Sequence, residues 1–287
     1  NYALDVKAED IVKRCFEEAW KMGLAYGYVT EDQGIVMPKG PVEWTYLIDV
    51  VDGSRTGNIG AEMACTNIAI SRGDITEPVL ADIEAGVVLA IKERKMYVVK
   101  KGQGVYEVIP ALGKNSRLAE IKAKENVTSK LQDASLVSES YSVLAELLGI
   151  AKDPLLREVS FETQYPSGSY AALSLVRGQN DLHIDLRRRL VLDCPYLPVA
   201  SKPNLKLVSP MDIAPEFLMF KELGLVVTDA YGGFLDNAPL WKFNPDGSWS
   251  NDIQLSWVAA TTSILHRQTM EKIEEGFANL RQKYPRP

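Results

Sequence analysis

Histidine and cysteine are scarce in this sequence of 287 residues, which contains two histidines and three cysteines. With only His183 and His266 available, a catalytic triad built on histidine or a histidine-rich metal site has little material. The cysteines, Cys15, Cys65 and Cys194, are odd in number and form no Cys-x-x-Cys pair. Neither a disulfide framework nor a structural zinc site is therefore indicated, and we expect a cytoplasmic protein whose chemistry depends on carboxylates.

Long apolar runs and an excess of positive charge are also missing. No stretch of about 18 apolar residues occurs, so we expect no membrane span. The net charge of −6 and the pI near 5.2 argue against a nucleic-acid partner, because affinity for a phosphate backbone requires a cationic face. The first residues resemble no signal peptide and do not begin with Met, so we expect the numbered chain to start inside a longer one.

The most informative stretch covers residues 44–54. Its aromatic and β-branched beginning predicts a strand, which ends in Asp49 and Asp52 before a turn at Gly53 and Ser54. Carboxylates bind hard divalent cations, glycine lets a backbone come close to a ligand, and the N–H groups that open a helix bind phosphate. An ordinary capped turn would also explain this stretch, so the rest of the chain has to decide.

The predicted elements divide the chain into two halves, and 46% hydrophobic residues suffice for one large domain or two lobes. In the first half, a helix over 7–22 covers an antiparallel sheet with strands over 26–29, 44–48, 65–71, 85–91 and 95–99, closed by a turn at 102–104. The second half alternates helices over 140–148, 169–176, 212–223 and 267–284 with strands over 157–163, 181–186, 225–229 and 257–262. This alternation indicates an α/β layer, and the polar residues 123–130 predict a boundary between lobes 1–130 and 131–287.

In this order the motifs resemble the inositol monophosphatase superfamily, which includes fructose-1,6-bisphosphatases and archaeal enzymes that act on both substrate types. The family signature, roughly W-x-x-D-P-[IL]-D-G-[ST], is similar to residues 44–54. A second signature, W-D-x-A-A-G followed by a helix and G-G-x-V-T-D, resembles residues 211–214 and then 223–232. Because the resemblance extends over nearly the whole chain, it implies the layered α-β-α-β-α sandwich of that family, of mixed α+β and α/β class.

The resemblance also assigns roles to individual residues. The metal ligands would be Glu31, Asp49, the carbonyl group of Val51, Asp52 and Asp212, holding two or three Mg²⁺ ions, and Asp10 would help to hold the most labile ion. Glu31, Ser54 and Asp52 would be catalytic, with the Ser54 hydroxyl and Glu31 orienting the attacking water. The phosphate and substrate contacts would come from Gly53, Ser54, Gly168, Ser169, Asp185 and Asp212.

The function implied is a Mg²⁺-dependent phosphatase of small sugar or polyol phosphates. Inositol-1-phosphate is the first substrate expected and fructose-1,6-bisphosphate the second, with sensitivity to lithium and assembly as a homodimer or homotetramer. Paired divalent ions would offset the charge on the phosphoryl oxygens, so no phosphoenzyme is needed. Two alternatives stay open: a nucleotide 3′-phosphatase of the adenosine 3′,5′-bisphosphate type, and a non-catalytic regulatory protein that keeps the fold.

Several positions depart from the family pattern. Val50 replaces proline, Met211 replaces tryptophan, and Pro215 and Glu216 replace alanine and glycine. Residues 187–210 form an insertion, which we expect to be a lid or an oligomer contact, with too many prolines for a stable helix.

Other side chains leave more than one interpretation open. The three arginines 187–189 would bind a second phosphate, begin a solvated loop, or form intersubunit salt bridges. Cys15 and Cys65 are expected on core faces, and His183 is expected to be structural.

Overall fold

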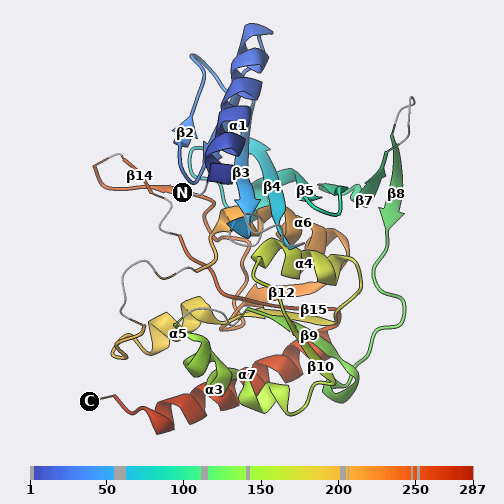
Figure 1. Ribbon diagram of the computed structural model, residues 1–287, viewed down its shortest axis with the longest axis vertical. Helices are drawn as coiled ribbons and strands as arrows, with labels where there is room; N and C mark the ends of the chain where they lie inside the picture. Colours follow the sequence, from blue (N-terminus) through green and yellow to red (C-terminus); the bar gives the residue numbers. More distant parts are fainter. Residues whose placement is uncertain are drawn as a thin grey trace.

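The computed structural model describes residues 3–54, 63–110, 116–139, 143–200, 205, 207–246, 248–250 and 253–286. Its two main sheets alternate with helices in five layers (Figure 1). Helix α1 (Ala3–Lys21) covers one face of the first sheet, α4 (Gly168–Val176) and α6 (Ala214–Glu222) lie between the sheets, and α3 (Ala145–Leu156) and α7 (Ser263–Lys283) cover the second. The predicted α-β-α-β-α sandwich is confirmed.

The first sheet has eight strands in the order β2-β1-β3-β4-β5-β6-β7-β8. Their bounds are β1 (Tyr26–Thr30), β2 (Gly34–Val36), β3 (Trp44–Asp52), β4 (Cys65–Arg72), β5 (Ile83–Ala90), β6 (Lys95–Lys100), β7 (Gly104–Ile109) and β8 (Arg117–Ile121), with the 3₁₀ turn η1 (Leu80–Asp82) before β5. The sheet was expected to be antiparallel, but β1 and β3 pair in parallel. The expected end of the β region at residues 102–104 is also wrong, because Gly102 and Gly104 have positive φ angles and form a turn from β6 into β7.

The second sheet has five strands in the order β10-β9-β11-β15-β12. Their bounds are β9 (Ser135–Ser138), β10 (Phe161–Gln164), β11 (Leu182–Asp185), β12 (Val226–Asp229) and β15 (Trp257–Ala260). The 3₁₀ turn η2 (Leu131–Asp133) precedes β9, and β13 (Lys242–Phe243) pairs with β14 (Trp249–Ser250) in a separate hairpin. Strands of the first sheet end at Ile121 and those of the second begin at Ser135, while the lobe division at residue 130 stays a prediction.

In the described part of the chain, three hydrophobic clusters hold the layers together. The largest lies between the sheets and combines residues of both halves, such as Leu47 and Val88 with Phe217 and Trp257. A second cluster joins α3 and α7 to the outer face of the second sheet, and a third joins α1 to the first sheet through Phe16. Each fully buried apolar side chain of this size contributes roughly 1.5–3 kcal/mol to the free energy of unfolding. The middle layer is therefore fixed to both sheets.

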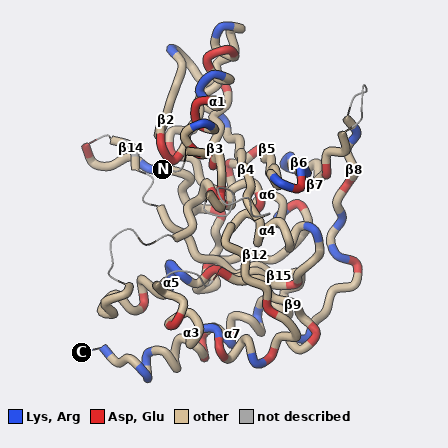
Figure 2. Tube along the Cα trace, in the orientation of Figure 1, with Lys and Arg blue, Asp and Glu red and all other residues tan. Residues whose placement is uncertain are grey.

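The expected core position of Cys15 is wrong: the side chain is exposed on α1, one residue before the buried Phe16. Figure 2 shows charges of both signs interspersed along α1 and α7. Among the described residues, no helix combines the length and the apolarity that a membrane crossing would require.

The insertion begins as a helix, α5 (Arg187–Asp193), contrary to the expectation from its prolines. This helix ends before Pro195, so the prolines limit its length and do not prevent it. Arg189 stacks 4.2 Å from the ring centroid of Phe277 and forms a 2.6 Å ion pair with Glu274, which ties α5 to α7. The insertion's role as a lid or oligomer contact stays a prediction.

Candidate metal centre

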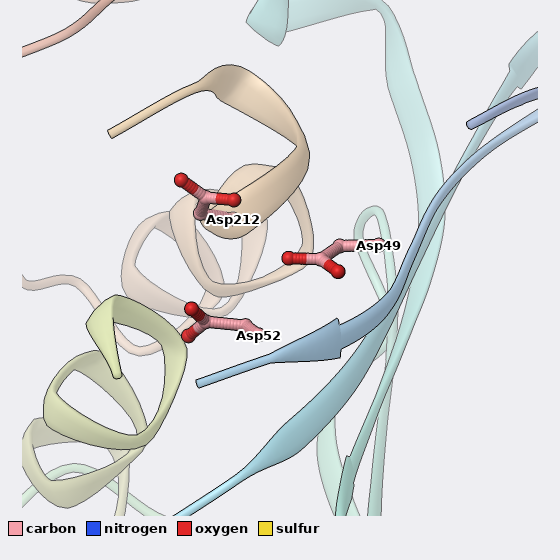
Figure 3. A group of neighbouring side chains, drawn as sticks. All are labelled: Asp49, Asp52 and Asp212. Carbon is pink, nitrogen blue, oxygen red and sulfur yellow. The ribbon is translucent and has the colours of Figure 1, made fainter. Parts of the chain in front are cut away.

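A β-bulge in β3 places two aspartates on one side of the strand. In a regular strand, residues three apart point to opposite faces. Here Asp49 lies opposite Asn67 of β4, whereas Asp52 lies opposite Cys65, so β3 contains one residue more than its partner between these pairs. The bulge reverses the alternation, and both carboxylates extend to the same side (Figure 3).

A capped 3₁₀ turn, η3 (Pro210–Asp212), brings the third carboxylate. Ser209 caps this turn, because its hydroxyl accepts the Met211 N–H at 3.1 Å while its own N–H donates to Asp212 Oδ2 at 2.8 Å. Pro210 fixes the first φ angle of the turn. This reciprocal capping holds the Asp212 side chain beside β3.

Asp49, Asp52 and Asp212 each offer a carboxylate oxygen within 4.8 Å of the other two. All three side chains are half-buried, so the cluster is held by the protein but open to solvent. Figure 3 shows Asp212 next to the two aspartates of β3. The structure thus brings together three of the predicted metal ligands from positions 163 residues apart, counting from Asp49 to Asp212.

The pKa values of the three aspartates are raised, and burial is the largest cause for each. Burial, repulsion by Asp212 and repulsion by Asp52 raise the pKa of Asp49 well above its usual value. Burial and the charge of Asp52 raise the pKa of Asp212 to about 8, and burial raises that of Asp52 to about 6. Without a cation, a proton shared between Asp49 and Asp212 relieves part of the repulsion.

The first turn of α4 points at Asp52. Ser167, the N-cap residue, donates from Oγ to Asp52 Oδ2 at 2.6 Å and accepts the Tyr170 N–H at 3.0 Å. The Ser169 N–H donates to the same carboxylate oxygen at 2.8 Å. These bonds and the helix dipole favour the ionised form of Asp52. Gly168 and Ser169, which were predicted to contact the substrate, therefore belong to a segment that binds Asp52, a predicted metal ligand. Ser167 belongs to the same segment and was not predicted.

Glu31 lies in the turn after β1 and is exposed. It is outside the group of three aspartates, but its charge raises the pKa values of Asp49 and Asp212. Thr30 and Gln33, on either side of the turn, donate to Glu9 Oε2 of α1 at 3.0 and 2.6 Å. The buried Glu9 therefore holds the turn that carries Glu31.

Asp10, predicted to help bind a third ion, has an exposed side chain on α1. The acidic residue of α1 that faces the sheet is its neighbour, Glu9, which is buried. Helical periodicity places the apolar stripe but does not decide which of two adjacent acids lies at its edge. The role of Asp10 stays a prediction.

Residues 51–54 cover the end of β3 and the start of the turn that follows it. The Val51 N–H donates to Asp49 Oδ1 at 3.0 Å, and the Val51 carbonyl oxygen, predicted as a metal ligand, accepts the Ser54 hydroxyl at 2.8 Å. Gly53 has a φ angle of +83°, which a residue with a side chain rarely adopts. The turn thus depends on glycine and places Ser54 beside Val51.

Asp185 is buried at the end of β11 and binds Arg187. The Arg187 Nε donates to both carboxylate oxygens at 3.0 Å, and its Nη2 also pairs with the buried Glu139. The solvated loop start considered for the arginines is wrong for Arg187 and Arg189, because both are 2% exposed. The substrate contact of Asp185 stays a prediction. In this structure the Asp185 side chain is paired with Arg187.

Three further buried residues support the cluster and were not predicted. Asn67 donates from Nδ2 to the Asp212 carbonyl oxygen at 2.8 Å, Ser167 binds Asp52, and Glu216 of α6 contacts Ser169. Each contact joins segments far apart in the sequence, so no local pattern marks it. The one available signal was the unusual glutamate at a position where the family pattern has glycine.

The donor set fits a hard divalent cation. Three carboxylates supply oxygen ligands within a few ångströms of each other, and a cation would offset the cost of burying their charges, which raises the pKa values of Asp52 and Asp212. Asp49, Asp52 and Asp212 would hold it, while Ser167, Ser169 and Asn67 orient the ligand-bearing segments.

No protein-family model and no curated protein matches the sequence. Among solved structures, the chain is similar to the extragenic suppressor protein suhB from Bartonella henselae, with a TM-score of 0.65 and 17% identity over 95% of this chain and 85% of that one. An IMPase from Thermotoga maritima has a TM-score of 0.65 and 17% identity over 98% and 85% of the two chains. SaIMPase-II with bound inositol monophosphate has a TM-score of 0.64 and 15% identity over 98% and 87%. The similarity covers nearly the whole chain.

Proposed function

We propose that this chain, which has the fold of the inositol monophosphatases, is a Mg²⁺-dependent phosphatase of small phosphate monoesters. The observation that carries the proposal is the convergence of Asp49, Asp52 and Asp212 at the end of a bulged strand, beside the N-terminus of α4. Inositol-1-phosphate is the first substrate that we propose, in line with the inositol monophosphate bound to SaIMPase-II, and fructose-1,6-bisphosphate is the second.

The chain's own residues would divide the work as follows. Divalent ions held by the three aspartates would stabilise the charge of the phosphoryl group and increase the acidity of water. The Ser54 hydroxyl, anchored on Val51, and the exposed Glu31 would orient the attacking water. His183 packs against Trp257 and His266 contacts Thr228, so neither histidine serves Ser54 as a base, and water attack is favoured over a phosphoserine intermediate.

The backbone supplies the remaining contacts. The positive φ angle of Gly53 lets the main chain come close to a phosphate, and the N–H groups of Gly53 and Ser54 would donate to its oxygens. Ser167 and Ser169 would keep Asp52 ionised and fixed while the phosphate binds. Asp185, released from Arg187, would contact substrate hydroxyls.

A nucleotide 3′-phosphatase is the second candidate. A further structure of SaIMPase-II, with a TM-score of 0.62 to this chain, contains 2′AMP. Tyr165 and Tyr170 pack edge to face at 5.1 Å between ring centroids, on either side of the α4 N-terminus that binds Asp52. An aromatic pair at this place could contact a base.

Release of inorganic phosphate decides between these substrates. The panel contains inositol-1-phosphate, fructose-1,6-bisphosphate, adenosine 3′,5′-bisphosphate and 2′AMP, each with Mg²⁺ and with EDTA. We expect Asp52→Asn and Asp212→Asn to lose activity by at least about 10²-fold, the scale for removing one charge-stabilising group. Asp153→Asn, which removes the same charge from the exposed face of α3, should keep it.

Two outcomes would contradict the proposal. Equal release with and without EDTA would exclude a metal-dependent reaction. No release from any phosphate, together with measurable Mg²⁺ binding, would favour the non-catalytic alternative. Analytical ultracentrifugation of the same preparation would test the proposed homodimer or homotetramer.

A further inference from the structure

Glu216 is a carboxylate residue buried behind the aspartate cluster. It lies in the first turn of α6 and is 0% exposed. Its Oε1 is in hydrogen-bond contact with the Ser169 hydroxyl, and within the described part of the chain Oε2 has no hydrogen-bond partner. Burying an ionised carboxylate that has no cation beside it costs free energy, so we ask whether Glu216 is protonated.

The number of protons available to the Ser169 hydroxyl and its two neighbours shows whether Glu216 is protonated. The Ser169 Oγ lies in contact with Glu216 Oε1 and 2.7 Å from Asn67 Oδ1. A serine hydroxyl carries a single proton and can donate only one of these bonds. One of the two acceptors must therefore bring a proton of its own.

The orientation of Asn67 decides which one. Its Nδ2 donates to the backbone carbonyl oxygen of Asp212 at 2.8 Å, so its Oδ1 faces Ser169. The opposite orientation would place the amide oxygen against that carbonyl oxygen, and two acceptors would meet. Asn67 Oδ1 thus takes the proton of Ser169, and the bond between Ser169 and Glu216 needs a proton from the carboxyl group.

We infer that Glu216 is a neutral carboxylic acid that donates to Ser169 and acts as a positioning residue for the aspartate cluster. The bonds run from Glu216 to Ser169, from Ser169 to Asn67, and from Asn67 to the Asp212 carbonyl oxygen. At its other end, Ser169 donates its N–H to Asp52. One buried acid is therefore linked to the main chain of Asp212 and to the side chain of Asp52, two of the predicted ligands, without adding charge to them.

The surroundings agree with a neutral acid. Burial raises the pKa of Glu216 well above its usual value, and the charges of Asp52 and Asp212 raise it further. The thiol of Cys65, on β4, is a further titratable group beside Glu216, and burial raises its pKa as well. The Ser169 hydroxyl and the backbone N–H of Glu216 lower the pKa of Glu216, but burial raises it by more, and the acidic neighbours add no charge that favours the ionised form.

The first test concerns the proton and needs no activity. Infrared difference spectra between the wild-type protein and Glu216→Gln at neutral pH should contain the carbonyl stretch of a protonated carboxyl group. Glu18→Gln, which changes an exposed glutamate of α1, should remove no such band. Absence of the band in the Glu216 difference spectrum would show that Glu216 is ionised and would overturn the inference.

Unfolding gives a second readout of the same proton. Unfolded glutamate titrates near pH 4.3, so above that pH unfolding releases the proton of Glu216, and wild-type stability falls as pH rises. Glutamine lacks this dependence. The ratio of the two unfolding constants should grow by up to about tenfold per pH unit above pH 4.3, and a constant ratio would contradict the inference.

The positioning role rests on the proposed metal site, and it is tested by calorimetric titration with Mg²⁺. Glu216→Gln keeps a donor to Ser169 and should bind Mg²⁺ as the wild type does. Glu216→Leu removes the donor and should bind about 10-fold more weakly, the lower end for loss of a group that orients a ligand. Wild-type affinity in Glu216→Leu would exclude the positioning role. If that variant does not fold, Ser169→Ala removes the next bond of the chain and gives the same comparison.

The failures are distinguishable. A protein that releases no phosphate but shows the carboxyl band leaves the protonated Glu216 intact and rejects the phosphatase. An enzyme that releases phosphate but lacks the carboxyl band supports the phosphatase and rejects the protonated Glu216.

Discussion

Ser167 and Asp52, 115 positions apart in the sequence, are joined by a 2.6 Å hydrogen bond from a hydroxyl to a carboxylate oxygen. The same hydroxyl caps α4, so one side chain both begins a helix of the middle layer and holds a carboxylate of the first sheet. The position of Asp52 therefore depends on how α4 is packed, and predictions about the cluster can be made from residues that would never touch a metal.

Ser167→Ala should weaken both the helix and the metal site. Loss of an N-cap hydroxyl costs about 0.5–2 kcal/mol of the free energy of unfolding. Mg²⁺ affinity should also fall about 10-fold, since Asp52 loses one of its two donors on Oδ2. Thermal unfolding and calorimetric titration measure the two effects. Thr262→Ala removes the N-cap of α7 and should lower stability alone; equal metal affinity in both variants would contradict the prediction.

The metal-free protein should lose stability as the pH rises from about 4 to about 8, up to about pH 6 through Asp52 and up to about pH 8 through Asp212, because both pKa values are raised in the folded state. Unfolded aspartate titrates near pH 3.9, so in this range the folded state holds more protons than the unfolded state, and stability falls with rising pH. Melting temperatures in EDTA across this range test the slope. Mg²⁺ should reverse it, because the cation replaces the protons, and Asp212→Asn should flatten it in EDTA.

Ser54→Ala should lower kcat by about 10²–10³-fold if the hydroxyl orients the attacking water. Ser54→Thr keeps a hydroxyl beside the Val51 carbonyl oxygen and should retain most of the activity. Steady-state kinetics on the best substrate of the panel provide the comparison. A phosphoserine trapped at residue 54, or full activity of Ser54→Ala, would show that water attack is wrong for this chain.

Gly276→Ala should destabilise the protein by about 1–3 kcal/mol through overpacking. A Cβ atom at Gly276 of α7 would lie 1.9 Å from the Ala151 carbonyl oxygen of α3, so the two helices would have to separate. Gly149→Ala, also within a helix, has free space around its Cβ and should stabilise the protein by about 0.5–1 kcal/mol. Chemical denaturation measures both changes, and equal effects would mean that the α3–α7 contact adjusts more easily than the geometry indicates.

The sequence indicated the parts of the fold that have a local pattern. The apolar strand before Asp49, and the helix that follows Asp212, are set by periodicity and by turn residues within a few positions. The strands β7 and β8 were missed because Gly102 and Gly104 were interpreted as an end, although glycines with positive φ angles serve a hairpin equally well.

The contacts that complete the site have no local signal. The bulge in β3 is a mismatch with β4, so it belongs to a pair of strands and cannot be found in one of them. The same holds for Asn67, whose bond to Asp212 crosses 145 positions, and for Arg187, which a charge pattern places in solvent but two buried acids keep inside. Such polar contacts depend on how the layers pack against each other, so no single segment of the sequence indicates them.

The turn η3 leads directly into α6, and α6 packs against strands of both sheets. A cation bound to Asp212 of this turn and to the two aspartates of β3 would link the first sheet to the middle layer. The layers could not swing apart to admit a substrate without pulling the ligands away from the ion. With the ion bound, a substrate would therefore have to reach the aspartates without separation of these layers.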